Sequence, residues 1–210
     1  MKYLGKPAGM WALFAGSFEK HLTVEFDLTA GQAKDVAARA KKKYREIIAK
    51  LPEFDKRDRF EMNIVNCAML AAFILCMPQR PDIKTLTDYY AAVMMTPTMK
   101  AFCRASGKKK FTPKDIEGMK ATAKLRAGDR NPYSWNMDFF EYENGSGYEA
   151  RFTTCGICTL MQVLGLYDLT PALCHLDYTM SDAGGASDFV REYTLASGGP
   201  YCDCGYHKKQ

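Results

Sequence analysis

A thiol and a carboxylate stand three residues apart at Cys174 and Asp177. Thr170 and Pro171, just before them, favour the start of a helix. Residues three apart on a helix are neighbours, so we expect both side chains on one face. In such a pair the thiol is a candidate nucleophile and the carboxylate is its acid or base partner. The alternative is a buried cysteine beside an exposed aspartate.

Arg191 lies in "DFVREYTLA", residues 188–196, which has the pattern of a strand. Strand side chains alternate, so Arg191 shares a face with Phe189, Tyr193 and Leu195. A buried guanidinium needs an anion. The anion is either a carboxylate of the protein or the carboxylate of a ligand, which arginine binds well in a bidentate manner. A third interpretation leaves both faces half exposed.

Four further thiols occur in two close pairs. Cys202 and Cys204 fall on one face of a last strand, and Asp203 falls on the other, where it can form a salt bridge or hold a turn. Cys155 and Cys158 open a helix after a strand, where a helix N-terminus lowers a thiol pKa. As an alternative, the four thiols together would be the ligands of a zinc ion. Redox chemistry is less favoured because no βαβ unit surrounds Cys155 and Cys158.

The first half of the chain has the apolar spacing of helices. Helices are expected over residues 34–51, 60–77, 82–103 with a break at Pro97, and from Pro113, which follows the cap residue Thr112. Trp135 is expected to anchor the core where helices give way to strands. The turn at residues 143–147 separates two strands between Asn136 and Thr154.

Helices are then expected over residues 155–164 and from Thr170, followed by a loop at 181–187 and strands at 188–196 and 201–207. The order predicts the fold class α+β, with N-terminal helices followed by a C-terminal β-β-α-α-β-β antiparallel-sheet unit. We expect a single domain over residues 1–210, with a helical half at about 1–130 and a mixed half at about 131–210.

The composition is that of a globular protein, with 47% hydrophobic and 25% charged residues. The 29 basic and 24 acidic residues give a formal charge of +5. Basic runs at residues 41–45 and 107–110 lack the aromatic context of a nucleic-acid-binding module, so no nucleic-acid partner is expected. A basic surface does favour the approach of an anionic substrate.

The longest apolar stretch, residues 63–78, contains two asparagines and is shorter than the roughly 20 residues of a membrane span. We expect a buried core helix there and no membrane partner. The apolar surface of this helix would also serve as the interface of a homo-oligomer. Lys6 and Pro7 interrupt the apolar N-terminus, which makes a poor signal peptide. Because Cys67 and Cys76 lie inside the apolar helix, we expect reduced thiols in a cytoplasmic protein.

The C-terminal motifs resemble those of the L-2-amino-thiazoline-4-carboxylic acid hydrolase family. The matching features are Cys155, Gly165, Cys174 with Asp177, Arg191 with Thr194, Gly198, and Cys202 with Asp203. "YREIIAKLPEF", the apolar helix and "NPYSWN" resemble the family more weakly. Cys204 stands where the family usually has an aromatic residue, and Cys158 is not part of the family motif.

The resemblance implies a hydrolase that opens 2-amino-thiazoline-4-carboxylate, a small cyclic amidine-like carboxylate, to a carbamoyl-cysteine. Arg191 would hold the substrate carboxylate, with Thr194 and Cys155 also binding substrate. Cys174, ahead of Cys202, would be the nucleophile.

Asp177 or Asp203 would move protons in that reaction. No cofactor is expected, although a divalent metal that activates water between Asp177, Asp203 and Cys202 is an alternative.

Two other classes of protein fit the same residues. A small-molecule sensor domain would still use Arg191 to clamp a carboxylate, and replacing its cysteines would leave binding intact. A zinc-stabilised interaction protein would hold zinc with Cys155, Cys158, Cys202 and Cys204, so metal analysis separates it from the other two.

Overall fold

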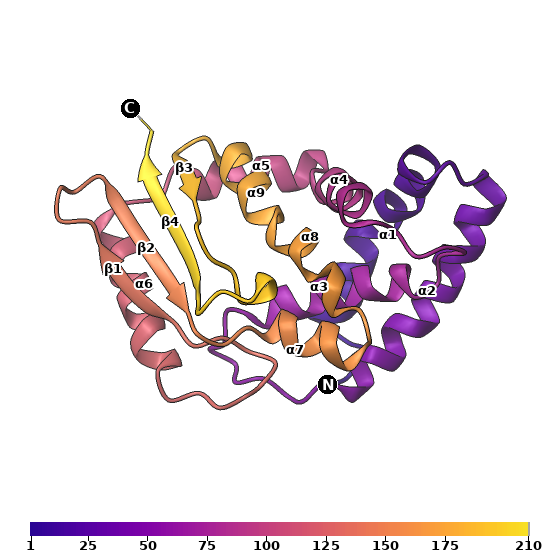
Figure 1. The fold of residues 1–210 in the computed structure, drawn as a ribbon, viewed down its shortest axis with the longest axis horizontal. Coiled ribbons are helices and arrows are strands. Elements are labelled where there is room, and N and C mark those ends of the chain that lie inside the picture. Colours follow the sequence, from indigo (N-terminus) through magenta and orange to yellow (C-terminus); the bar gives the residue numbers. More distant parts are fainter. Residues whose placement is uncertain (210) are drawn as a thin grey trace.

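The protein is described by a computed structural model, which covers residues 1–209. Helices α1 and α2 lie at one end of the molecule and the sheet lies at the other (Figure 1). In chain order the elements are α1 Lys6–Glu25, α2 Ala30–Lys50, α3 Glu61–Ile74, α4 Ile83–Met94, α5 Pro97–Gly107, α6 Pro113–Arg126, β1 Asp138–Glu141, β2 Gly147–Phe152, α7 Gly156–Val163, α8 Thr170–Cys174, α9 Leu176–Gly184, β3 Ser187–Val190 and β4 Cys202–Lys208, with 3₁₀ turns at Tyr167–Leu169 and Leu195–Ser197. The predicted α+β class is confirmed.

Side-chain caps explain where several helices begin. Thr29 and Gln32 form a reciprocal capping box at the start of α2. Asp82 caps α4, and Thr96 caps α5 with Pro97 at its first position. The break predicted at Pro97 is therefore confirmed, because a new cap forms there.

Helix α1 was not among the expected helices. It buries Met10, Phe14, Phe18 and Leu22, which recur every four residues and form one apolar stripe. The spacing is visible in the sequence, but there the segment is considered only as a poor signal peptide, interrupted by Lys6 and Pro7. Proline is compatible with a helix here because it occupies the first turn.

Helix α3 is the predicted core helix, and its burial is confirmed from Ile64 to Ile74. It packs against α1, α2 and α7. A helix that is apolar all round needs neighbours on every side. Within residues 1–209, no helix combines the length and the apolar composition that a membrane crossing requires.

The sheet has the strand order β1-β2-β4-β3, with every neighbouring pair antiparallel. The hairpin predicted between Asn136 and Thr154 forms β1 and β2. Along β4, Cys202 and Cys204 are buried in the core, whereas Asp203 lies on the other face opposite Arg151. The expected alternation of thiols and carboxylate on this strand is confirmed.

The strand predicted over residues 188–196 is too long, because β3 ends at Val190. The Asp203 carboxylate accepts hydrogen bonds from the backbone N–H groups of Glu192 (2.9 Å) and Tyr193 (2.6 Å). Thr194 then caps the 3₁₀ turn at Leu195–Ser197. The Asp203 carboxylate thus accepts the backbone N–H groups that a longer β3 would have used for hydrogen bonds within the sheet.

The helix predicted from Thr170 is interrupted at His175 and continues further than expected. Cys174 ends α8 and Asp177 lies in the first turn of α9, so they belong to two consecutive helices. The predicted loop at 181–187 is wrong in its first part, because α9 continues to Gly184. Gly185 ends α9 in the left-handed conformation, at a φ of 72°.

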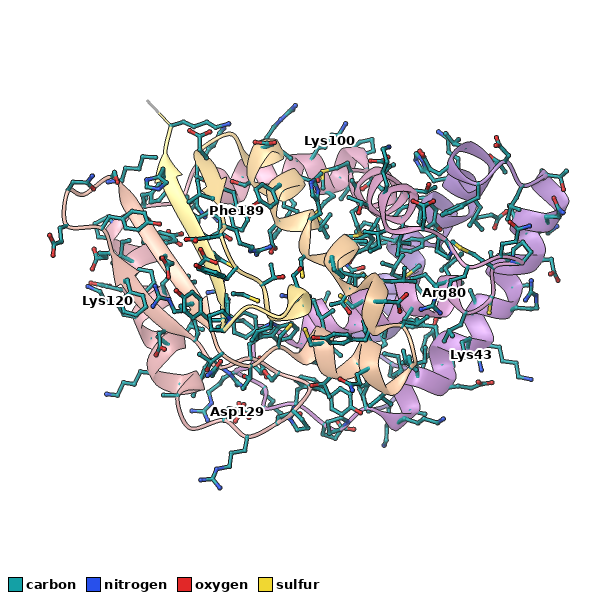
Figure 2. The ribbon with its side chains drawn as sticks, in the orientation of Figure 1. Lys43, Arg80, Lys100, Lys120, Asp129 and Phe189 are labelled. Carbon is teal, nitrogen blue, oxygen red and sulfur yellow. The ribbon has the colours of Figure 1, made fainter. Side chains whose placement is uncertain are left out.

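Buried side chains form a hydrophobic cluster that extends from Met10 in α1 to Cys204 in β4. In Figure 2, Lys43 and Arg80 lie in the helical end of the molecule, and Lys120 and Phe189 lie in the sheet end. Side chains fill the space between these two ends. The candidate site residues lie where α7, α8 and α9 meet the sheet.

Candidate active site

A cavity of about 220 Å³ lies between α8, α9 and the segment that follows β3. Its walls include Cys174, Arg191 and Thr194, which the sequence placed among the candidate site residues. His175 and Ser197 add further polar groups. The volume is below the roughly 300 Å³ typical of drug-sized sites, so the cavity suits a small ligand.

Arg191 is buried, as its alternation with Phe189 predicts, with a side chain only 6% exposed. It forms an ion pair with Asp177 and donates from Nη1 to the backbone oxygen of Cys174 at 3.0 Å. Nη2 also donates to Cys204 Sγ at 2.9 Å. The protein's own carboxylate therefore neutralises Arg191, and Nε has no hydrogen-bond partner within residues 1–209.

Cys174 lies beside this ion pair in a poor environment for a thiolate. Burial raises its pKa, and the nearby Cys155 raises it further. Arg191 acts in the opposite direction but does not reverse the shift. The Asp177 carboxylate is used by Arg191, so a simple thiol–carboxylate pair between Cys174 and Asp177 is not what the structure contains.

Cys155 is the thiol whose pKa is lowered. The nearby Cys158 thiol, the backbone N–H groups of Cys158 and Ile157, and the Trp135 side chain favour its thiolate, and together these effects on the pKa outweigh burial. Cys155 is the N-cap residue of α7, where the backbone donors of the first turn are free. The pKa of every other cysteine in the chain is raised.

The local fold brings these donors to Cys155. Gly156 lies so close to the carbonyl oxygen of Tyr133 that a Cβ atom there would overlap it. The backbone oxygen of Trp135 accepts a hydrogen bond from Arg126 Nε at 3.0 Å. The segment before the sheet is thus tied down beside the start of α7, which fixes the indole near Cys155.

The two thiols of β4 complete the cluster. Cys202 Sγ accepts the backbone N–H of Leu195 at 3.2 Å, and burial raises its pKa. Burial likewise raises the pKa of Cys204 to about 12, next to Arg191. Asp203 lies on the opposite face and holds the turn after β3, which was one of the two roles open to it.

The thiols are close enough to shift one another's pKa values, but they do not converge on one point. In the part of the chain that the structure describes, no three histidine, cysteine, aspartate or glutamate side chains are arranged to hold a metal ion. The zinc set of Cys155, Cys158, Cys202 and Cys204 is therefore not assembled. The alternative trio of Asp177, Asp203 and Cys202 is also divided, because Asp203 faces away from the core.

Residues 62–206 match the model of the L-2-amino-thiazoline-4-carboxylic acid hydrolase family. The match covers more than half of the 210 residues. The chain belongs to this family. The region shared with the L-2-amino-thiazoline-4-carboxylic acid hydrolases begins in α3 and ends in β4, so it contains the cavity and the thiol cluster. A search of curated proteins and a search of solved structures each found no match.

Sequence reasoning emphasised Cys174 and treated Cys155 as a substrate contact. The sequence predicts Cys155 at a helix start, but no pattern in it places the Trp135 side chain near this thiol. Trp135 is buried and packs against Phe60, so its predicted role as a core anchor is confirmed. Its second contact, with Cys155, depends on tertiary structure.

Proposed function

We propose that this member of the hydrolase family is a thiol-dependent enzyme that opens a small cyclic amidine carboxylate, with L-2-amino-thiazoline-4-carboxylate as its first candidate substrate. Family membership supports the class of reaction. The observation that carries the thiol mechanism is the position of Cys155 at the start of α7, where polar neighbours lower its pKa. A thiolate is the reactive form of cysteine, so the acidic thiol is the better nucleophile near neutral pH.

In the proposed reaction, Cys155 Sγ adds to the ring carbon that is double-bonded to nitrogen, and that nitrogen takes a proton. The bond from this carbon to the ring sulfur then breaks, and the sulfur leaves as a thiol after protonation. Water next attacks the carbon, now linked to Cys155, and expels the enzyme thiolate. The sum is one substrate plus one water giving N-carbamoyl-cysteine, with the enzyme unchanged.

Arg191 and Thr194 are the proposed contacts of the substrate carboxylate. Both line the cavity, and Ser197 adds a hydroxyl. Arg191 is already paired with Asp177, so a substrate carboxylate would share the guanidinium with it. Binding would thus bring a second anion next to the guanidinium, with Asp177 close to the bound substrate.

Asp177 is the proposed proton carrier and Asp203 a positioning residue. The Asp177 side chain is 46% exposed and contacts Arg191, so it can exchange protons with water. Asp203 is occupied by the backbone of Glu192 and Tyr193 and thereby holds the segment that carries Thr194. Cys174 lines the cavity, and both Cys174 and Cys202 lie near enough to Cys155 for its charge to raise their pKa values.

The test is turnover of L-2-amino-thiazoline-4-carboxylate by the purified full chain, followed by loss of the ring absorbance and by product detection. Cys155→Ser is expected to lower kcat/KM by at least about 1,000-fold, because it removes the nucleophile. Arg191→Met should also abolish turnover. The control Cys76→Ala changes a buried thiol at the end of α3 and is expected to leave turnover within about twofold.

Other outcomes are informative about the alternatives. Retained activity in Cys155→Ser with loss in Cys174→Ala would return the nucleophile to Cys174. Loss of activity with a chelator would favour a metal-activated water. Binding of the substrate by folded wild-type protein without turnover would favour a sensor domain, and neither binding nor turnover would reject this substrate.

A further inference from the structure

A second cavity, of about 290 Å³, is lined by residues of α5, α6, α9 and the sheet. Its polar lining includes Arg59, Lys110, Asp115 and Asp177. It shares Asp177 with the ion pair of the candidate active site, but Cys155, Cys174 and Arg191 are not among its lining residues. Apart from Asp177, the proposed hydrolysis uses none of the residues that line this cavity.

Lys110 extends into this cavity over aromatic rings. Its Nζ lies 3.3 Å from the ring centroid of Tyr206, 5.2 Å from that of Tyr148 and 5.6 Å from that of Phe111. Within residues 1–209 it forms no ion pair with a carboxylate. Burial lowers its pKa to about 8, so the amine is still mostly protonated at pH 7.

Arg59 is the second cation at this cavity. Its Nη1 contacts only weak acceptors, Met119 Sδ and Thr122 Oγ1, both at 3.5 Å. No carboxylate in the described part of the chain forms an ion pair with it. Two cationic side chains without a carboxylate partner therefore face one cavity.

The carboxylates at the cavity are already engaged elsewhere. Asp115 Oδ2 accepts the Tyr148 hydroxyl at 3.0 Å and the Phe111 N–H at 2.8 Å, next to the start of α6. Asp177 pairs with Arg191. Neither carboxylate lies within ion-pair distance of Lys110 or Arg59, so the cations remain available to an outside anion.

The rest of the wall is largely apolar and includes Phe102, Met119 and Met180. Methionine and aromatic side chains contact compact hydrocarbon groups of varied shape. We propose that this cavity binds a small organic carboxylate, whose charged group contacts Lys110 and Arg59 and whose apolar body contacts Phe102, Met119 and Met180. This second site is independent of the proposed hydrolase function.

Isothermal titration calorimetry on the full chain tests this, with benzoate as the probe and benzamide as the neutral molecule of the same shape. Wild-type protein is expected to bind benzoate and not benzamide. Lys110→Met should weaken benzoate binding at least about tenfold, since a charge-assisted contact is lost. Arg59→Met should also weaken it, and Lys110→Arg should retain much of it because the charge remains.

The matched control is Lys114→Met, which removes an exposed lysine of α6 that does not line the cavity. It is expected to bind benzoate as the wild type does. Circular dichroism of each variant checks that it is folded. The proposal is overturned if folded wild-type protein does not bind benzoate, if benzamide binds equally well, or if Lys110→Met and Arg59→Met leave benzoate affinity unchanged.

Discussion

Cys155 and Cys174 are chemically identical side chains in one cluster, yet their pKa values move in opposite directions. The nearby Cys158 thiol, the N–H groups of the first turn of α7 and the Trp135 side chain favour the Cys155 thiolate and lower its pKa. Cys174 is buried without comparable donors and lies near Cys155, so a second negative charge there is unfavourable. Hydrogen bonding to the charged form lowers a thiol pKa, whereas burial and a neighbouring negative charge raise it.

Alkylation by iodoacetamide at a series of pH values, with each cysteine followed by mass spectrometry, tests this difference. The midpoint for Cys155 is expected below the ordinary thiol value of 9.0, because a lowered pKa keeps the thiolate present down to lower pH. Trp135→Phe should move the midpoint upward by removing the indole donor. A midpoint for Cys155 at or above 9.0 in folded wild-type protein would contradict the assignment.

At the scale of the elements, the position of α7 decides what Cys155 can do. Gly156 allows the first turn of α7 to approach the backbone of Tyr133 at a separation that a Cβ atom forbids. The N–H groups of Ile157 and Cys158 in the same turn help to lower the pKa of Cys155. A small displacement of this turn would therefore change both the packing and the acidity of the thiol.

Gly156→Ala is expected to destabilise the protein by about 1–3 kcal/mol, because the added methyl group is forced against backbone. It should also lower hydrolysis of the candidate substrate and raise the pH at which Cys155 is alkylated. Urea denaturation measures the stability. The control Gly16→Ala lies within α1 with open space around it and should be neutral or stabilising by up to about 1 kcal/mol. Equal effects of the two substitutions would contradict the argument.

At the scale of the whole molecule, a buried polar network joins the helical end to the sheet end. The side chains of Arg126 and Asp58 are 2% and 1% exposed, and their charged atoms lie 3.3 Å apart. Ser134 donates to Asp58 at 2.6 Å, and Arg126 also bonds the backbone of Trp135. The network connects the segment before α3, the end of α6 and the approach to β1.

Arg126→Met is expected to lower the free energy of unfolding by about 3–5 kcal/mol, because it leaves Asp58 buried without its cation. Asp58→Leu combined with Arg126→Met should recover part of the loss, since the buried Asp58 carboxylate is removed and only the partly exposed Asp129 loses its cation. Urea unfolding measures all three proteins. Arg130→Met, at an exposed position nearby, is the control and should change stability by no more than about 0.5 kcal/mol. An equal effect at both arginines would contradict a special role for the network.

Periodicity and caps made much of the fold predictable, because those signals depend on neighbours in the chain. Pro97, Thr112 and the apolar spacing of α2 are examples. The end of β3 could not be read in this way, since it depends on the carboxylate of Asp203, which comes from the next strand. The partner of Arg191 was left open for the same reason.

The sequence by itself determined the α+β order of elements, the buried helix α3, the alternation along β4 and the motifs of the hydrolase family. Tertiary structure decided that Arg191 pairs with Asp177, that Asp203 holds a turn, and that Cys155 has the lowered pKa. Local patterns specify which face a side chain occupies. Only packing brings distant donors such as Trp135 to that face, and the donors set the protonation of the thiol.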